Sequence, residues 1–155
     1  MLYLGYLGEA KLLNIKENAL KLLIVRKPPR VIPESFIHTP QLSPSIDLFN
    51  STQRWKKGDF TPKELHWLKQ QNIEMNEDTW WELYKVKFDY ELKNRPDMRK
   101  ALARLEELLK EGKEIYLFCF CKDVNKCHRL LVGKYIEEKG YLVSYESNKE
   151  GNKSK

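Results

Sequence analysis

The sequence predicts an α/β domain of the three-layer, Rossmann-like type, with a mostly parallel central sheet and flanking helices. Three observations support this prediction. Short apolar segments typical of strands occur near both ends of the chain, at residues 2–7, 20–25 and 141–145. The segment 114–121 is apolar at nearly every position, which is typical of a central strand covered on both faces. Helical patterns separate these segments, so strand, helix and strand alternate along the chain.

The first two strands are expected at residues 2–7 and 20–25. Each is a short apolar segment next to turn or charged residues. The second ends at Arg26-Lys27-Pro28-Pro29, where two prolines stop regular structure because each lacks an amide hydrogen. Residues 28–60 contain five prolines and many polar residues. We therefore expect a long irregular segment there, one that either carries function or packs over the core.

Three helices are expected between residues 60 and 112. Thr61-Pro62-Lys63-Glu64 is a capping box with proline at the first helical position, in which the Thr oxygen and the Glu carboxylate satisfy two unpaired amides. Asn76 is the expected cap of the second helix, whose first-turn acids favour the positive end of the helix dipole. Pro96 begins the third helix and Gly112 ends it.

The second of these helices carries aromatic residues on one face. Its apolar side chains recur at intervals of three and four residues, at Trp81, Tyr84, Phe88 and Leu92. A platform for stacking nucleic-acid bases would use the same residues, but this spacing is typical of a buried face. We therefore expect the four side chains to pack against the core.

The last elements are the strand within 114–121, a helix at roughly 126–139 and a strand at 141–145. They complete a single α/β domain, which we expect to span residues 1–146. Residues 147–155 are Lys, Asn, Ser and Gly with one Glu, and we expect them to form a disordered basic tail.

The chain has a net charge of +6, from 28 Lys and Arg residues against 22 Asp and Glu. The first sixty residues hold nine bases and five acids, and the segment 21–30 has four bases and no acid. Either an anionic partner or an ordinary solvated edge explains such an excess. No apolar run reaches the length of about 18 residues that a membrane-spanning helix needs, so we expect no membrane partner.

All three cysteines lie within nine residues, a pattern that is no disulfide framework. The first residues lack the basic start of a secretory signal, and we expect a cytoplasmic protein. The cysteines mark one segment, 119–129, which follows the most apolar strand and opens a helix. In parallel α/β sheets the ligand lies beyond the carboxyl ends of the strands. The unpaired amides at the start of the helix favour an anion at that place.

The segment 119–129 and the end of the second strand supply the candidate site residues. The candidate ligand-binding residues are Arg26, Cys119, Cys121 and Arg129, and the candidate catalytic residues are Cys127 and His128. Arg129 offers a bidentate fork to an anion, and His128 is a group that changes protonation near neutral pH. The helix dipole and the neighbouring cations are expected to lower the pKa of the Cys127 thiol.

The cysteines also suggest a metal or redox role. Cys119 and Cys121 project to the same side of a strand because side chains alternate, and Cys127 and His128 would complete a Cys3His set. A Cys-x-Cys pair followed by five residues differs from the two-residue knuckle usual for zinc, so the leading prediction includes no metal. The same thiols also suit a redox sensor.

These segments together resemble domain-of-unknown-function family 488 (DUF488). The similar segments are Tyr3-Leu-Gly-Tyr-Leu-Gly8, Val25-Arg26-Lys27-Pro28-Pro29, Leu42-Ser43-Pro44-Ser45, Trp81 to Leu92, Leu117-Phe-Cys-Phe-Cys-Lys-Asp123 and Cys127-His128-Arg129. The Cys-His-Arg tripeptide after a buried strand is the signature of that family, and the resemblance covers about residues 1–142. Relatives often have Ala where this chain has Ser43. At the position of Cys121 they have Cys or Glu, which argues against an obligatory zinc site.

The resemblance implies an α/β fold with the Cys-His-Arg segment at its site, and it implies no particular reaction. The leading functional prediction is a phosphate-bearing ligand, a nucleotide or a nucleic-acid end, bound at 119–129 with or without catalysis. One alternative is a non-catalytic nucleic-acid-binding module that uses the segment 21–30 with Arg54, Lys56, Lys57 and Trp55. The other is a cysteine-based redox or metal-binding protein. No cofactor and no oligomeric state is predicted.

Overall fold

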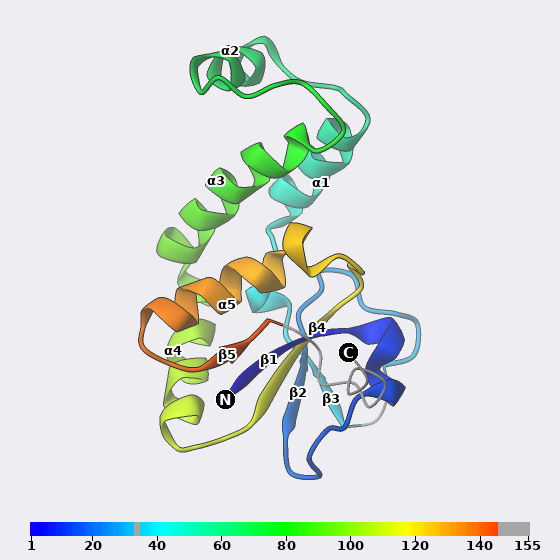
Figure 1. Cartoon of the computed structure of the whole chain (residues 1–155), viewed down its shortest axis with the longest axis vertical. Coiled ribbons are helices and arrows are strands. Elements are labelled where there is room, and N and C mark those ends of the chain that lie inside the picture. The colour runs from blue at the N-terminus through cyan, green and yellow to red at the C-terminus, as the bar shows by residue number, and fades with distance from the viewer. Residues whose placement is uncertain (33–34, 146–155) are drawn as a thin grey trace, which may run out of the picture.

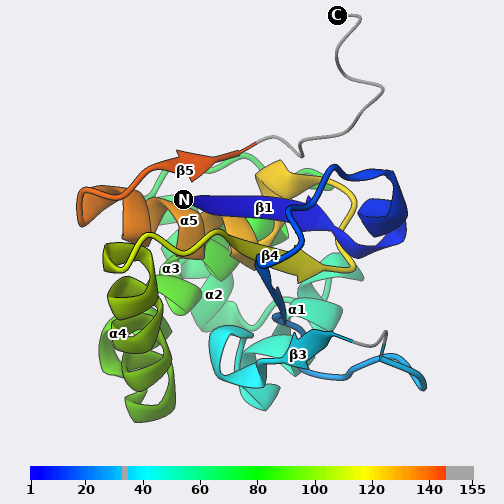
Figure 2. The same ribbon diagram turned by 90° about the horizontal axis from the view of Figure 1, so that it is seen from below.

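A computed structural model of the chain describes residues 1–32 and 35–145, and in this part of the chain a five-stranded sheet forms the centre of the molecule (Figure 1). The strands are β1 (Leu2–Tyr6), β2 (Leu20–Leu23), β3 (Phe36–His38), β4 (Ile115–Cys119) and β5 (Val143–Ser144). All neighbouring pairs are parallel, in the spatial order β3-β2-β4-β1-β5. Figure 2 shows β5 and β3 at the two edges, with β1 and β4 between them.

Five α-helices and three short 3-10 helices connect the strands in the described ranges. The α-helices are α1 (Ile46–Lys56), α2 (Pro62–Gln70), α3 (Thr79–Asn94), α4 (Pro96–Lys110) and α5 (His128–Glu138). The 3-10 helices are η1 (Leu7–Leu12), η2 (Pro40–Leu42) and η3 (Val124–Lys126). This arrangement confirms the predicted α/β class with its parallel sheet and flanking helices. None of the helices in the described ranges is long and apolar enough to cross a membrane.

Each face of the sheet packs against its own core, because side chains alternate along a strand. All five α-helices share one core with strand residues such as Leu4 and Leu117. The opposite face carries Tyr116 and Phe118, which pack with residues of η1 and of the loops that follow it. β4 lies in the middle of the sheet and all five of its residues are buried, as its apolar sequence predicts.

The helices after residue 60 agree closely with their predicted signals. The capping box is present, since the Thr61 hydroxyl accepts from the amide of Glu64 and the Glu64 carboxylate accepts from the amide of Thr61. The predicted aromatic face of α3 is buried in the helix core. However, α3 starts at Thr79, because Asn76 uses its side chain to accept from the amide of Asp78 in the turn before the helix.

The prediction of a long irregular segment at 28–60 is wrong for the described part of that range. β3 and α1 both lie within it. Ser45 caps α1 by accepting a hydrogen bond from the amide of Leu48, and Asp47 favours the helix dipole in the first turn. The prolines nearest to α1 precede its cap and do not lie inside the helix. They therefore suggest an irregular segment without interrupting the helix.

Figure 1 shows α1, α2 and α3 extending beyond the sheet, away from the chain terminus marked N. α1 and α3 therefore cover the region just past the strand ends, where they contact each other. The predicted tail, 147–155, lies outside the described residues, and the domain boundary at 146 stays a prediction.

Candidate functional site

The carboxyl ends of β2 and β4 lie side by side and face the start of α5. The two strands pair in parallel with Leu23 opposite Phe118, and the amide of Ile24 donates to the carbonyl of Phe118 at 2.9 Å. A cavity of about 270 Å³ opens at this point, with walls from the two strand ends and from α1, α3 and α5. Its position matches the predicted crevice of a parallel α/β sheet.

The cavity is lined by four lysine and arginine residues and by no aspartate or glutamate. The four are Arg26, Lys27, Lys56 and Lys126. Lys126 is paired with Asp78 at 2.7 Å, outside the cavity wall. Arg26, Lys27 and Lys56 form no ion pair with an acid of the described residues, and these three cations beside low-dielectric walls favour anions in the cavity.

Aromatic rings form much of the remaining wall. Phe49, Trp80, Tyr84 and Phe120 all line the cavity. The ammonium group of Lys56 lies over the Trp80 ring, 4.5 Å from its centre, which is a favourable cation–π distance. The site therefore offers cations for an anionic group and flat rings for an apolar one.

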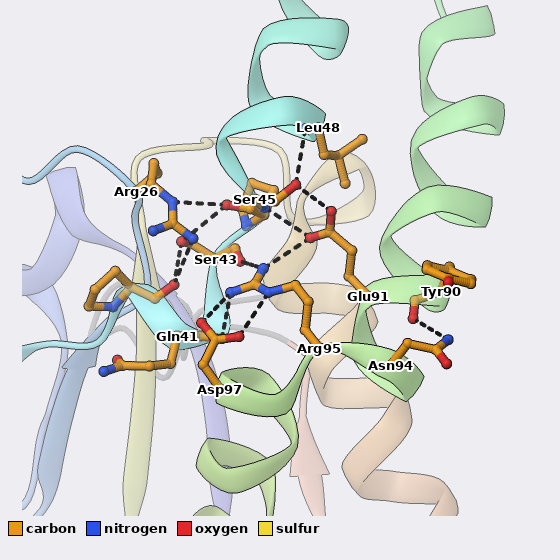
Figure 3. A network of polar contacts seen from close by, with 12 residues as sticks. Arg26, Gln41, Ser43, Ser45, Leu48, Tyr90, Glu91, Asn94, Arg95 and Asp97 are labelled. Carbon is orange, nitrogen blue, oxygen red and sulfur yellow. Dashed lines mark hydrogen bonds and ion pairs between the residues drawn. The ribbon is translucent and has the colours of Figure 1, made fainter.

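Two backbone carbonyls hold the Arg26 guanidinium at the cavity. Its Nε donates to the carbonyl of Pro44 at 3.0 Å, and its Nη2 donates to the carbonyl of Pro40 at 3.4 Å (Figure 3). These contacts use two of the five N–H groups of an arginine. Arg26 is therefore positioned by the loop before α1 and keeps donors for a ligand.

A polar network fixes that loop in turn. Arg95 donates to the carbonyl of Ser43 at 2.7 Å and to the carboxylate of Glu91 at 3.0 Å (Figure 3). It also forms a two-bond pair with Asp97, at 3.0 and 2.8 Å. The network joins the turn between α3 and α4 to the loop before α1, whose carbonyls accept hydrogen bonds from Arg26.

The same network sets the start of α1. The Glu91 carboxylate accepts from both the amide and the hydroxyl of Ser45, at 2.9 and 2.5 Å. The Ser45 oxygen in turn accepts from the amide of Leu48, which is the first bond of the cap. Because α1 supplies Phe49 and Lys56 to the cavity, the network positions part of the cavity wall as well as Arg26.

The three cysteines converge at the inner wall of the cavity. Cys119 is the last residue of β4, Cys121 follows in the loop, and Cys127 is the residue that precedes the first turn of α5. Their sulfur atoms all lie within 4.8 Å of one another. Cys119 and Cys127 are buried, whereas Cys121 is half-buried. The three thiols thus meet as the metal alternative requires, although β4 ends at Cys119 and Cys121 lies in the loop and not on a strand as that alternative assumed.

His128 joins the cysteines through one ring nitrogen. Its Nε2 lies 2.5 Å from the carbonyl oxygen of Ile24, so this nitrogen carries a hydrogen and donates it. The other nitrogen, Nδ1, lies 3.9 Å from the sulfur of Cys119 and 3.8 Å from that of Cys127. Burial disfavours the charged ring, but the neighbouring Cys119 thiolate raises the pKa of His128 above its ordinary value.

Arg129 lies behind the cavity wall rather than in it. Its side chain is 2% exposed, and it is not among the residues that line the cavity. Its Nη1 donates a hydrogen bond to the carbonyl of Cys121 at 2.6 Å, and the same nitrogen lies 3.4 Å from the sulfur of Cys127. The structure thus brings Arg26, the cysteines and His128 to the cavity, and gives Arg129 contacts to the cysteine loop.

The thiol with the lowered pKa is Cys119, not Cys127 as the sequence predicts. Hydrogen bonds from the Cys121 and Cys127 thiols, with the charge of His128, lower the pKa of Cys119. Burial, followed by the hydrogen bond to Cys119, raises the pKa of Cys127 well above its ordinary value. The hydrogen bond to Cys119 raises the pKa of Cys121 to about 11. Cys127 sits at the helix start, but its burial outweighs the helix dipole.

Some residues of the site escape prediction from the sequence. Phe49 is missed because the sequence analysis does not predict helix α1, although Ser45 and Asp47 are a recognisable cap, and Lys56 is expected only on the surface of the nucleic-acid alternative. Tyr84 was expected only to pack, and it both packs and lines the cavity. Trp55, expected to stack bases in the nucleic-acid alternative, is 3% exposed and packs in the helix core.

Comparison with known families agrees with the resemblance that the motifs indicate. The model of DUF488-N3a, described as the active DUF488-N3 subclade, matches residues 9–140. No curated protein and no solved structure matches the chain. The matched range contains β2, β3 and β4, all five α-helices, and every cavity residue named above. The chain therefore belongs to the DUF488 family.

Proposed function

We propose that the chain binds a phosphate-bearing ligand, a nucleotide or the end of a nucleic acid, in the cavity at the carboxyl ends of β2 and β4. One observation carries the proposal: four bases line this cavity and no carboxylate does. A phosphate group accepts charge-assisted hydrogen bonds, which are roughly twice as strong as neutral ones. The positive wall favours that group over a neutral or cationic ligand.

The size and lining of the cavity narrow the ligand class. A volume of about 270 Å³ lies just below the roughly 300–1,000 Å³ typical of small-molecule sites, so the proposed ligand is no larger than one nucleotide. The rings of Phe49, Trp80 and Phe120 offer surfaces on which a base can stack. A longer nucleic acid would enter by its phosphorylated end.

The proposed contacts differ in their distance from the ligand. Arg26 and Lys56 contact the phosphate directly, because both line the cavity and neither is paired with an acid in the described ranges. Cys119 and Cys121 contribute to the inner wall. Arg129 acts through the Cys121 carbonyl, which it holds in place. It is therefore a positioning residue for the ligand.

The proposal is a binding function and contains no reaction step. Cys127 and His128, the predicted catalytic pair, stand in the wall of the cavity. The Nε2 of His128 is used by the Ile24 carbonyl, and its Nδ1 faces two sulfurs. A role for this pair as acid, base or nucleophile stays a prediction.

The alternative of a nucleic-acid surface on the basic amino-terminal half has less support. Trp55 is buried, and Arg54 is paired with Glu64 at 3.5 Å. A nucleic acid would have to bind through its backbone phosphates to the remaining lysine and arginine residues of the segment 21–30. The affinity of such binding falls steeply as the salt concentration rises.

Thermal unfolding with inorganic phosphate and a set of mononucleotides tests the proposal. A ligand at a hundred times its dissociation constant stabilises the folded chain by about 2.7 kcal/mol, and we expect a clear rise in Tm. Arg26→Gln and Lys56→Met should each weaken binding about 10-fold or more, since a charge-assisted hydrogen bond contributes about 1.5–3 kcal/mol.

Arg54→Gln is the matched control, because Arg54 is a base of the same half of the chain that does not line the cavity. It should bind as the unchanged protein does. No rise in Tm with any phosphate compound at millimolar concentration would contradict the proposal, as would equal binding by all three variants.

A further inference from the structure

The arrangement of the three sulfur atoms is close to that of a metal site. Tetrahedral zinc with Zn–S bonds of about 2.3 Å holds its sulfur ligands about 3.8 Å apart. The sulfurs of Cys119, Cys121 and Cys127 lie within 4.8 Å of one another, so closure around an ion requires movements of about 1 Å or less. The three residues lie on three different elements: the end of a strand, a loop and the start of a helix.

His128 has the hydrogen bonding of a metal ligand. A histidine that binds a metal usually donates its other ring N–H to a carbonyl or carboxylate, which sets the tautomer and the ring orientation. Here Nε2 donates to the Ile24 carbonyl, so the lone pair of the neutral ring is on Nδ1. Nδ1 lies 3.8 and 3.9 Å from two sulfurs, close to the separation of about 3.6 Å that tetrahedral zinc gives to nitrogen and sulfur ligands.

The local charges also fit a zinc ion with three thiolates. Such a centre has a net charge of −1, since each cysteine binds as a thiolate and releases its proton. Arg129 is a buried guanidinium that pairs with no carboxylate of the described residues. Its Nη1 lies 3.4 Å from the sulfur of Cys127, and its Nε is buried without a hydrogen-bond partner. Arg129 therefore supplies the positive charge that balances the centre.

We propose that Cys119, Cys121, Cys127 and His128 bind one zinc ion in the wall of the cavity. A set of three sulfurs and one imidazole nitrogen suits zinc and does not suit magnesium or calcium, which take oxygen ligands. The set is closed, as structural zinc sites are, and the ion joins the end of β4, the loop after it and the start of α5. The half-buried Cys121, which lines the cavity, gives the ion its path of entry.

Metal analysis of the full chain, purified under reducing conditions without chelators, tests the proposal first. We expect one zinc ion per chain. Replacement of zinc by cobalt should give the ligand-field bands of a tetrahedral site together with thiolate-to-cobalt charge transfer. These two readouts need no variant, so they do not depend on whether a variant folds. Zinc-free protein without a cobalt–thiolate spectrum would overturn the proposal, and iron in place of zinc would overturn the assignment of the metal.

Variants then test which residues bind the ion. Cys121→Ser and His128→Gln should each lower zinc affinity about 10-fold or more in competition with a chromophoric chelator. His66→Gln is the control, because His66 lies on α2 and does not line the cavity. Unchanged zinc affinity in Cys121→Ser would exclude Cys121 from the site and overturn the proposed Cys3His set.

The zinc proposal does not rest on phosphate binding, and the experiments separate the two. The Arg26→Gln variant should lose phosphate binding and keep its zinc, because the hydrogen bonds of the Arg26 guanidinium go to the loop before α1. Loss of zinc from Arg26→Gln, in protein that stays folded, would contradict the separation of the two sites.

Discussion

The guanidinium of Arg129 is buried and bonded to a backbone carbonyl, and its position decides its role. A charge taken out of water is costly unless it is paired or hydrogen-bonded. Arg129 meets this cost with the Cys121 carbonyl and the sulfur of Cys127 instead of a carboxylate. Arg129 therefore stabilises the cysteine loop, whereas Arg26 and Lys56 line the cavity.

The Glu114 carboxylate ties the start of β4 to the first residues of the chain. Its carboxylate accepts from the Lys16 ammonium at 3.0 Å and from the Tyr3 hydroxyl at 2.8 Å. A further ion pair joins it to the Met1 amino group at 3.1 Å. The hydrogen bonds from Lys16 and Tyr3 lower the pKa of Glu114 from 4.5 to about 2.

This lowered pKa predicts a specific dependence of stability on pH. A group with a depressed folded-state pKa stabilises the fold above its unfolded pKa and loses that contribution as the pH falls. We expect the stability difference between the unchanged protein and Glu114→Gln to be full at pH 7 and to shrink between about pH 4.5 and pH 2. Chemical unfolding of both proteins across this range measures it. A difference that stays constant down to pH 2 would contradict the assignment.

At the scale of elements, α1 is the helix on which the cavity depends and the one that the sequence does not reveal. Only Leu48, Thr52 and Trp55 of its eleven residues are buried, so its apolar face is narrow. The prolines before it indicate an irregular segment, and β3 is too short for its pattern to be distinctive. The strands at 2–6 and 115–119, and the helices after residue 60, have clear caps or long apolar patterns and were predictable.

The cap of α1 gives a prediction at this scale. Ser45→Ala removes both the acceptor for the Leu48 amide and the hydroxyl that donates to Glu91. We expect a loss of about 1–2 kcal/mol in the free energy of unfolding, as for other serine caps. Phosphate affinity should fall as well, because α1 carries Lys56 and Phe49 to the cavity. Denaturant unfolding and ligand titration measure the two effects.

Ser51→Ala is the control for this experiment, since Ser51 lies inside α1 and has no part in its cap. Its stability should change by less than about 0.5 kcal/mol. A Ser45→Ala variant that matches Ser51→Ala in both stability and affinity would show that the network around Glu91 does not set the position of α1.

At the scale of the whole molecule, the fold gathers bases that the sequence keeps apart. Arg26 follows β2, Lys56 ends α1 and Lys126 ends η3, yet all three line one cavity. The sequence predicts the edge of the sheet at which a ligand binds, because parallel strands end there. It does not predict which helices cover that edge, because this depends on long-range packing such as that between α1 and α3. The net charge of +6 alone therefore does not show which basic residues meet at the cavity, because their positions depend on that packing.

Chemical-shift mapping of the isotope-labelled chain with a mononucleotide tests phosphate binding in the cavity, because it reports where the ligand binds. We expect the amides of Arg26, Lys27 and residues 119–128 to shift together, along with the face of α1 that carries Lys56. Inorganic phosphate should perturb the same region more weakly. Shifts confined to Lys21 and Arg30, which do not line the cavity, or no shifts at millimolar nucleotide, would contradict this binding site.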